Sequence, residues 1–384
     1  MLDNTDWQIL LEYDKDPFQS YHALSKIIGV HHSTVADRIS NMKEKNVLRP
    51  DGIYHDSTRN MSRPTSEVIG AYSPTSLGLE RIHVLFKHIA SSKDYELLFD
   101  FCDSHPYTHY IARLFGAGVT LYSQFDIPKG TFQLHKDTFK QLVREFATGS
   151  DLEIFRDPTE ANAIPNYQKA RNFEWDNSVN TIEELWVNFL EKRQFNPFSL
   201  PEEGKPFDNI DAELIRELTI NGKTKITDLT DHFNLNKSTL SRRVSKIREH
   251  YISSARLVFG TSADKLLGFN NTQIVTGTFL KDSPLTGDLF LKFIQSDNIF
   301  PFDAFVTVDN NRFFLYTRAS IGLAGDFMQF LYENTDVFEL NQYQFYVRKS
   351  ITYPFYHGNY DQDSGFRTDE EYIKNKELET LIKS

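Results

Sequence analysis

The feature that most constrains this chain is an internal repeat. Residues 24–42 read LSKIIGVHHSTVADRISNM and residues 229–247 read LTDHFNLNKSTLSRRVSKI, so an offset of 205 residues aligns them. The aligned positions include Leu24 with Leu229, Ser33-Thr34 with Ser238-Thr239, and Arg38 with Arg243. Upstream, Leu2-Asp3 of the first copy corresponds to Ile210-Asp211 of the second, and downstream Leu77-Gly78-Leu79 corresponds to Leu267-Gly268-Phe269. Because ordered self-similarity is the signature of repeated structural units, the sequence predicts two copies of one plan.

Each copy begins with a segment of helical periodicity. In the first copy, Gly29 stands before the third apolar stripe, where a turn residue tolerant of positive φ belongs. We expect Ser33 to be the N-cap of the third helix. Three short helices with a tight turn before the third predict a helix-turn-helix in each copy.

A wing is expected after the first helix-turn-helix. Its strands would be Val47–Tyr54 and Glu67–Tyr72, and the polar segment between them carries Arg59 and Arg63. Arginines at such a tip can enter a minor groove; a disordered loop is the alternative. Residues 251–259 of the second copy lack this insertion, so the second wing should be short.

The rest of each copy alternates strand, helix, strand, strand, helix, strand. The predicted elements are residues 81–90, 93–104, 107–115, 119–127, 132–146 and 151–155, then 273–281, 285–296, 302–308, 312–319, 323–333 and 342–351. This βαββαβ order is that of a ferredoxin-like sandwich, with helices on one face of a sheet. The predicted fold class is α+β, with two winged helix-turn-helix domains alternating with two ferredoxin-like domains.

The same patterns predict the domain boundaries. The two winged helix-turn-helix domains occupy residues 1–75 and 210–268, the two ferredoxin-like domains residues 76–156 and 269–357, the linker residues 157–209, and a polar tail residues 358–384. The linker contains one predicted helix over residues 182–194, with Trp186 and Phe189 on its apolar side.

Composition restricts the function classes. The 384 residues are 40% hydrophobic, which is enough for several cores and excludes a wholly disordered chain. The single cysteine, Cys102, excludes a disulfide framework and a site of several thiolates. We see no membrane-length apolar run and no signal peptide pattern, so we expect a cytoplasmic protein. The net charge of −11 argues against non-specific coating of nucleic acid and directs attention to local basic segments.

The ordered motifs resemble those of the Lrp/AsnC (feast/famine) family of transcription regulators. Leu2-Asp3-x-x-Asp6-x-x-Ile9-Leu10 is similar to the first helix of that family, Gly29-Val30-x-x-Ser33-Thr34-Val35-x-x-Arg38-Ile39 to the second and third, and Ile69-Gly70-Ala71-Tyr72 with Leu77-Gly78-Leu79 to the wing exit and hinge. The resemblance covers residues 1–155 and 210–350. It implies DNA-binding heads joined to ferredoxin-like ligand and oligomerisation domains, and two fused copies imply a built-in pseudo-dimer.

The second copy carries the stronger candidate for DNA contact. Its third helix has five basic residues and no acid between Lys237 and Arg248. Hydroxyls and free N–H groups at a helix start bind phosphate, and arginine or lysine also reads guanine edges. The candidate residues are Lys237, Ser238, Thr239, Arg242, Arg243 and Lys246. A solvated basic face on a structural helix is the alternative.

The first copy carries a weaker candidate. Its residues are His31, His32, Ser33, Thr34, Arg38 and Lys43, and Asp37 and Glu44 offset their charge. The alternative is a degenerate domain that packs against the rest of the protein and does not contact DNA. A metal pair of His31 and His32 is not expected, because adjacent residues point apart on a helix. We expect neither a metal nor a cofactor.

Double-stranded DNA is the expected partner, and the ferredoxin-like sheets are candidates for self-association. The resemblance implies an amino-acid effector where a glycine precedes an aspartate by three residues. Here Gly116 is followed at that distance by Val119, which argues against such an effector.

Siroheme decarboxylases, which resemble the same fold, are the enzyme alternative. Polar residues on the predicted strand 107–115, His109 and Arg113, would then supply acid–base chemistry and propionate binding. The basic third helix would have no role in that enzyme, so we expect a sequence-selective DNA-binding regulator that is not an enzyme. An architectural DNA-binding protein that senses nothing is a third alternative.

Overall fold

The computed structural model describes residues 2–56, 61–116, 118–157, 161–162, 179–192, 205–260, 262, 271–280, 287–296, 302–309, 311–319, 321–334 and 337–374. The chain divides into two compact units, each assembled from separate stretches of sequence. Unit 1 comprises Met1–Leu79, Pro201–Leu266 and Tyr353–Arg367, and unit 2 comprises Glu80–Leu200, Leu267–Thr352 and Thr368–Ser384. No helix among these described residues is long and apolar enough to cross a membrane.

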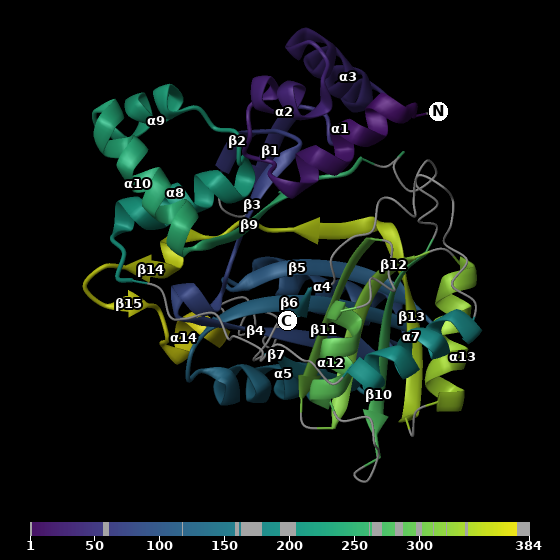
Figure 1. The fold of residues 1–384 in the computed structure, drawn as a ribbon. Helices are drawn as coiled ribbons and strands as arrows, with labels where there is room; N and C mark the ends of the chain where they lie inside the picture. The colour runs from purple at the N-terminus through teal and green to yellow at the C-terminus, as the bar shows by residue number, and fades with distance from the viewer. Residues whose placement is uncertain are drawn as a thin grey trace. The chain divides into compact units, whose positions relative to one another are not determined.

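Unit 1 contains two three-helix heads (Figure 1). The first head is α1 (Asn4–Lys15), α2 (Tyr21–Ile28) and α3 (His32–Glu44); the second head is α8 (Asn209–Ile220), α9 (Ile226–Phe233) and α10 (Lys237–His250). The strands of unit 1 are β1 (Gly52–Asp56), β2 (Met61–Thr65), β3 (Val68–Tyr72), β9 (Ile252–Leu257), β14 (Tyr360–Asp361) and β15 (Gly365–Phe366), with short helical turns at Thr75–Leu77 and His357–Asn359.

The turn before the third helix of each head contains a residue with positive φ. Gly29 has φ 77°, as predicted, and Asn234 has φ 50° at the equivalent place in the second head. The N-cap of α3 is His31, whose Nδ1 accepts from the backbone N–H of Ser33 at 3.4 Å. The prediction that Ser33 is the N-cap is therefore wrong, because the imidazole takes the place of the shorter hydroxyl.

The strand partner of β3 differs from the prediction. β1 pairs with β2, whereas β3 pairs antiparallel with β9, from Val68 opposite Leu257 to Tyr72 opposite Ile252. The predicted wing of residues 47–54 with 67–72 is thus wrong, because β3 leaves the wing and joins the strand that follows α10. Gly70 permits this path, since a Cβ there would lie 3.1 Å from the carbonyl oxygen of Leu218 on α8.

The structure does not describe two other sequence landmarks. Arg59 and the segment Leu267-Gly268-Phe269 lie outside the described residues.

Part of the predicted polar tail is packed: Tyr360 and Phe366 contact the apolar core of the second head, and Ile373 is buried in α14 (Glu370–Lys374) of unit 2.

Unit 2 is built on a nine-stranded sheet in the order β7-β4-β6-β5-β13-β10-β12-β11-β8. Its elements are β4 (Leu79–Lys87), α4 (Ser92–Ser104), β5 (Thr108–Phe115), β6 (Val119–Pro128), α5 (Phe132–Phe146), β7 (Asp151–Asp157), β8 (Ala161–Asn162), α7 (Val179–Lys192), β10 (Asn271–Phe279), α12 (Gly287–Ser296), β11 (Phe302–Asp309), β12 (Arg312–Ala319), α13 (Ile321–Asn334) and β13 (Val337–Thr352). The predicted order of strands and helices is confirmed in both halves of the sheet. β5 and β13 join the first half (β4 to β7) to the second (β10 to β13).

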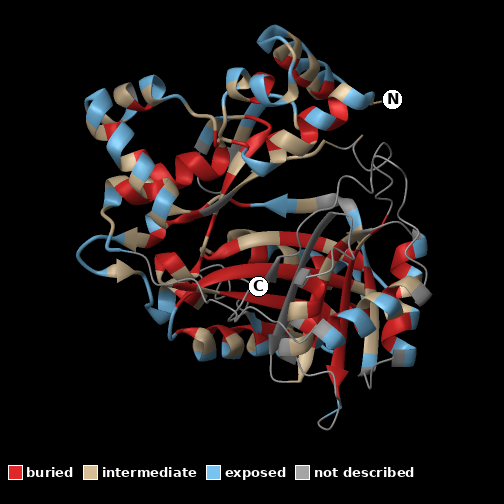
Figure 2. Ribbon diagram, in the orientation of Figure 1, coloured by how far each residue is buried: buried red, intermediate tan, exposed pale blue. Residues whose placement is uncertain are grey.

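The inner faces of the two half-sheets pack against each other. One apolar cluster contains Leu85, Tyr122 and Phe155 from the first half together with Phe314 and Tyr343 from the second. The ring of Phe314 stacks on His83, with centroids 4.6 Å apart. Figure 2 shows that buried residues follow these strands. The large aromatic content is therefore used to fill the space between the half-sheets.

Helices cover the outer faces. Phe139 of α5 contacts Phe86 of β4 in the first half. In the second half, α7, α12 and α13 enclose a cluster that includes Trp186, Phe189 and Phe293. The predicted linker helix with its apolar Trp186 and Phe189 is thus confirmed, and it packs as part of unit 2.

Replacing Phe314 by alanine should destabilise unit 2 strongly. The side chain is fully buried, and truncating such a phenylalanine leaves a cavity that costs about 3–5 kcal/mol. Urea unfolding of the full chain measures the loss. Phe115→Ala is the matched control, since Phe115 is 45% exposed; equal losses for the two variants would contradict the packed inner face.

Candidate nucleic-acid interface

In each head an arginine of the third helix is tied to the start of the first helix. Arg38 pairs with the N-cap Asp3 and with Asp6, whose Oδ1 lies 3.1 Å from Arg38 Nη1. Arg243 pairs in the same way with Asp208, at 2.9 Å, and with the buried Asp211, at 2.6 Å. By these interactions, Asp3 of the first head is equivalent to Asp208 of the second head. The aligned sequence motifs had instead matched Asp3 with Asp211.

These ion pairs change the expected roles of four candidate residues. Arg38 and Arg243 hold helices of their own heads together. Lys246 lies 3.5 Å from Asp211, and Lys43 lies 2.8 Å from Asp51. Their guanidinium and ammonium groups therefore already have anionic partners within the protein.

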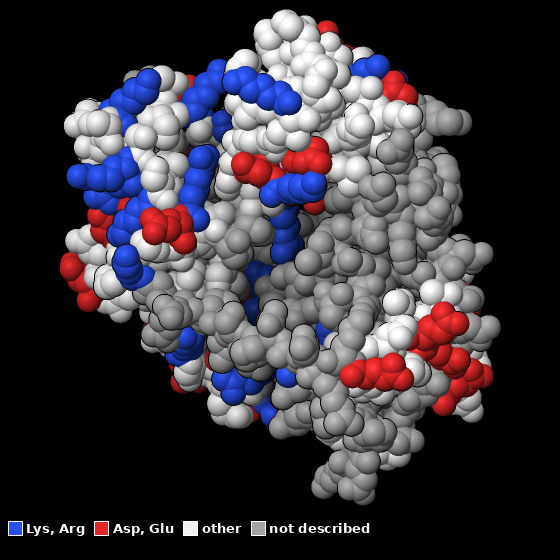
Figure 3. Space-filling view, viewed as in Figure 1, with Lys and Arg blue, Asp and Glu red and all other residues white. Residues whose placement is uncertain are grey.

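The second head presents the remaining basic candidates to solvent. Lys237, Ser238 and Arg242 are exposed at the start of α10, and Thr239 is partly exposed. Within the described part of the chain, neither Lys237 nor Arg242 forms an ion pair. Lysine and arginine side chains gather over α10 on the face shown in Figure 3.

The N-cap of α10 organises the backbone at this surface. Asn236 Oδ1 accepts from the backbone N–H of Thr239 at 2.9 Å and from the hydroxyl of Ser238 at 2.7 Å. The unpaired N–H groups of the first turn and the positive end of the helix dipole remain directed outwards beside Lys237. This arrangement is suited to binding a phosphate.

The start of α3 presents imidazoles where α10 presents permanent cations. His31, His32 and Ser33 are exposed, and Thr34 is partly exposed. The rings of His31 and His32 lie 4.3 Å apart. The expectation that they point apart is wrong, because His31 is the N-cap and lies outside the regular helix.

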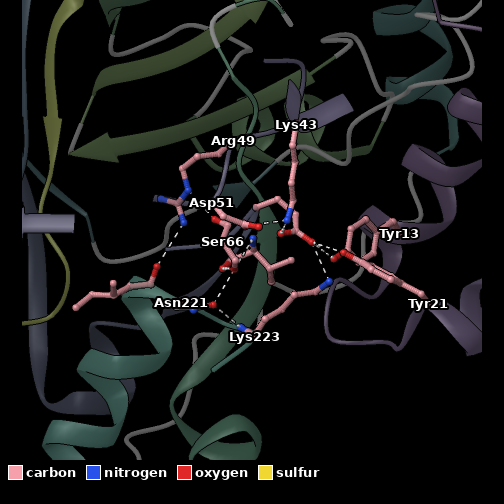
Figure 4. A network of polar contacts seen from close by, with 11 residues as sticks. Tyr13, Tyr21, Lys43, Arg49, Asp51, Ser66, Asn221 and Lys223 are labelled. Carbon is pink, nitrogen blue, oxygen red and sulfur yellow. Dashed lines mark hydrogen bonds and ion pairs between the residues drawn. The ribbon is translucent and has the colours of Figure 1, made fainter. Parts of the chain in front are cut away.

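A buried carboxylate that the sequence did not single out joins the two heads (Figure 4). Glu67, just before β3, is fully buried. Its Oε1 accepts from Tyr13 at 2.7 Å, from Tyr21 at 3.0 Å and from Lys223 of the α8–α9 turn at 2.8 Å. Its Oε2 lies 2.7 Å from Lys43. The network therefore connects all three helices of the first head to the second head.

Neighbouring polar contacts extend this network. Arg49 Nε donates to the carbonyl oxygen of Ser66 at 2.6 Å, and the Ser66 hydroxyl donates to Asn221 Oδ1 at 2.7 Å. The backbone N–H of Lys223 also donates to Asn221 Oδ1. The only sequence signal for Glu67 was an acid directly before the apolar run VIGAY, in a segment read as a wing strand.

The charges of this network perturb its acid–base equilibria. Burial alone would raise the pKa of Glu67, but hydrogen bonds from Lys223 and Lys43 outweigh it and lower the pKa to about 2. Burial lowers the pKa of Lys223, and burial together with Glu67 raises the pKa of Tyr13 and of Tyr21. Glu67 therefore stays ionised and the tyrosines stay protonated at neutral pH.

Unit 2 contains a separate polar cluster on its inner face. Arg81 donates twice to the buried Asp126, at 2.7 and 2.8 Å, and His109 Nδ1 lies 3.8 Å from the same carboxylate. Beside them His83 Nδ1 is 2.9 Å from the hydroxyl of Tyr122. His109 was the histidine expected for an enzyme, whereas Arg113 lies over the ring of Tyr95 on α4.

Comparison with known proteins identifies the first head. Residues 2–49 match the family described as winged helix-turn-helix DNA-binding. No protein of curated function matches the sequence. Among solved structures, E. coli AsnC is similar over 40% of this chain and 91% of its own, with a TM-score of 0.27 and 17% identity.

A structural likeness that spans nearly the whole chain is to an enzyme. The siroheme decarboxylase NirDL is similar over 99% of this chain and 100% of its own, with a TM-score of 0.55 and 10% identity. Its complex with an iron-uroporphyrin III analogue gives a TM-score of 0.53. The chain thus shares the fold of NirDL, and the expectation that it is not an enzyme is corrected by this finding.

Replacing Glu67 by glutamine should loosen unit 1, since it leaves Lys43 and Lys223 without their buried anion. Breaking a buried ion pair costs about 3–5 kcal/mol. Hydrogen exchange measured by mass spectrometry should show faster exchange in α1–α3 and unchanged exchange in β4–β7. Glu249→Gln, at an exposed carboxylate, is the control; identical exchange in both variants would contradict the role of Glu67.

The Glu67 carboxylate should also make the stability of unit 1 depend on pH. The pKa of Glu67 is about 2 in the folded chain, below the ordinary 4.5, so its stabilisation is present above pH 4.5 and lost as the pH falls towards 2. The shift corresponds to roughly 3 kcal/mol. Protection of α1–α3 should fall across this window in the wild type. If protection of α1–α3 falls with pH equally in the Glu67→Gln variant, Glu67 is not the group responsible.

Proposed function

We propose that this chain is a sequence-selective, DNA-binding transcription regulator with two winged helix-turn-helix heads. The observation that carries the proposal is the surface of α10, where Lys237 lies at the helix start beside unpaired N–H groups and Arg242 is exposed further along the helix. The match of residues 2–49 to a DNA-binding family supports the same role for the first head.

The proposal includes an internal duplication of Lrp/AsnC type. It is supported by the 205-residue offset, which relates both the Asp3–Asp6–Arg38 ion pairs to Asp208–Asp211–Arg243 and the positive-φ residues Gly29 and Asn234. It is also supported by the strand order, since β7-β4-β6-β5 and β13-β10-β12-β11 follow one scheme. The two heads would then be the DNA-binding ends of a pseudo-dimer.

In this proposal, α3 and α10 enter major grooves. The Glu67 network and the β3–β9 ladder would hold them at one spacing, and half-sites would lie about one helical turn apart or a multiple of it. The second head would bind more tightly, because its Lys237 and Arg242 are exposed while Arg38 and Lys43 of the first head are engaged within unit 1.

The two exposed cations of α10 are the residues to test. Lys237→Ala and Arg242→Ala should each weaken binding to a selected genomic fragment and reduce the log–log salt slope by about 0.9, one phosphate contact. Fluorescence anisotropy over a salt series measures both quantities. Lys140→Ala, on an exposed face of α5, is the matched control.

Three outcomes of this experiment separate the alternatives. Unchanged slopes in both variants would remove α10 from the interface. Equal affinity for unrelated fragments would favour the architectural role. Absence of binding at low salt would overturn the proposal.

A second candidate function is decarboxylation of an iron tetrapyrrole. It is supported by the full-length likeness to NirDL and by His109, which is partly exposed beside the buried Asp126–Arg81 pair. Imidazole is suited to proton transfer, and His109 Nδ1 lies 3.8 Å from the Asp126 carboxylate. Arg81 would position Asp126, and His109 would exchange the proton.

Titration with iron-uroporphyrin III, followed by its visible absorption, tests this second candidate. Saturable binding that His109→Ala weakens about tenfold, equivalent to 1.4 kcal/mol, is expected. Loss of carboxyl groups from the ligand, followed by mass spectrometry, would establish the reaction. His88→Asn is the control, because His88 pairs with Asp151 outside this cluster; no spectral change would exclude the candidate.

A further inference from the structure

We propose that the first head binds DNA in a proton-linked manner, through the imidazoles of His22, His31 and His32. The second head would bind throughout the neutral pH range, and the first would join it as the pH falls from 8 to 6. This inference rests on the proposed DNA-binding function and adds a mode of regulation to it.

The three histidines are gathered at the start of α3. His31 is the N-cap, His32 is the first residue of the helix, and their rings lie 4.3 Å apart. His22 reaches the same place from α2, with its ring 6.2 Å from that of His32. All three side chains are exposed, and Nδ1 of His31 lies 2.8 Å from the hydroxyl of Ser33. A protonated His31 would donate to that hydroxyl in place of accepting from the Ser33 N–H at 3.4 Å.

The second head shows what stands at the equivalent positions. At the offset of 205 residues, His31 corresponds to the N-cap Asn236 and His32 to Lys237. Asp37 corresponds to Arg242. The second head therefore has permanent cations where the first has groups whose charge depends on pH, together with an acid.

Among the residues that the structure describes, no anion is paired with the three rings. On α2, the exposed Lys26 follows His22 by one helical turn, and on α3 the nearest acid in sequence is Asp37. From α1, Asp3 and Asp6 are directed to Arg38. Within the described residues, no carboxylate forms an ion pair with His22, His31 or His32.

DNA binding would change this balance. A phosphate bound at the helix start would lie beside these rings and favour their charged form. Imidazole is the side chain that changes charge between pH 5 and 8. Because the bound state holds protons more tightly than the free state, thermodynamic linkage requires that affinity rise as pH falls.

The test is fluorescence anisotropy with a duplex that carries both half-sites, at pH 6, 7 and 8 and constant ionic strength. Uptake of one proton raises affinity by up to about tenfold per pH unit, so the wild type should gain at least about tenfold between pH 8 and 6. The triple variant His22→Gln, His31→Asn, His32→Gln should gain less than about twofold. Asparagine retains the N-cap.

Two further variants complete the design. His32→Lys installs the cation of the second head and should bind more tightly than the wild type at pH 8. His88→Asn, at an exposed histidine of unit 2, should keep the wild-type pH response. DNase footprints should lengthen from one half-site at pH 8 to two at pH 6.

The outcomes distinguish the inference from the function on which it rests. DNA binding with a pH response that survives in the triple variant, or with no pH response in the wild type, overturns proton linkage and leaves the regulator intact. Failure of the wild type to bind DNA at any of the three pH values overturns the proposed function, and the inference with it.

Discussion

One buried carboxylate, Glu67, is the interaction on which the arrangement of the two heads depends. It accepts from Tyr13 and Tyr21 of the first head and from Lys223 of the second, while Lys43 neutralises its other oxygen. Removing such a group from water is costly, and four polar partners offset that cost only in one geometry. The network thus specifies how the heads meet, and the β3–β9 ladder adds backbone hydrogen bonds along the same junction.

This arrangement divides the basic residues of the heads into two groups. Lys43, Arg38 and Arg243 have anionic partners inside unit 1 and stabilise it. Lys237 and Arg242 have none among the described residues and face solvent. A basic residue that is already desolvated and paired must give up its partner to bind a phosphate, which weakens DNA binding. An exposed basic residue has no partner to give up, and its phosphate contact favours binding through the release of counterions from the DNA. Charge alone therefore does not identify the DNA-binding surface, and the pairing of each charge does.

Local patterns in the sequence predicted the elements well. Periodicity located α3 and α10, Gly29 marked the turn, and the strand and helix order of unit 2 followed from alternating apolar runs. Partners distant in sequence were not predictable in this way. Glu67 accepts a hydrogen bond from Lys223, which is 156 residues away in the sequence. β3 pairs with β9 and not with the wing strand that precedes it. Neither choice has a periodic signature, because each depends on three-dimensional packing at Gly70 and on buried charge. His31 was missed as an N-cap because histidine is uncommon there.

The fold itself leaves the function open, since one architecture can support several chemistries and the sites decide among them. In this chain the two candidate sites lie in different units and differ in construction. At the start of α10, the exposed Lys237 lies beside unpaired backbone N–H groups, an arrangement suited to binding an anion from solvent. In unit 2, Arg81 and Asp126 neutralise each other, and His109 is the group beside them that retains access to solvent. The exposed cations of α10 therefore suit a polyanion such as DNA, whereas a ligand at the polar cluster of unit 2 would have to be recognised through His109 and the inner face of the sheet.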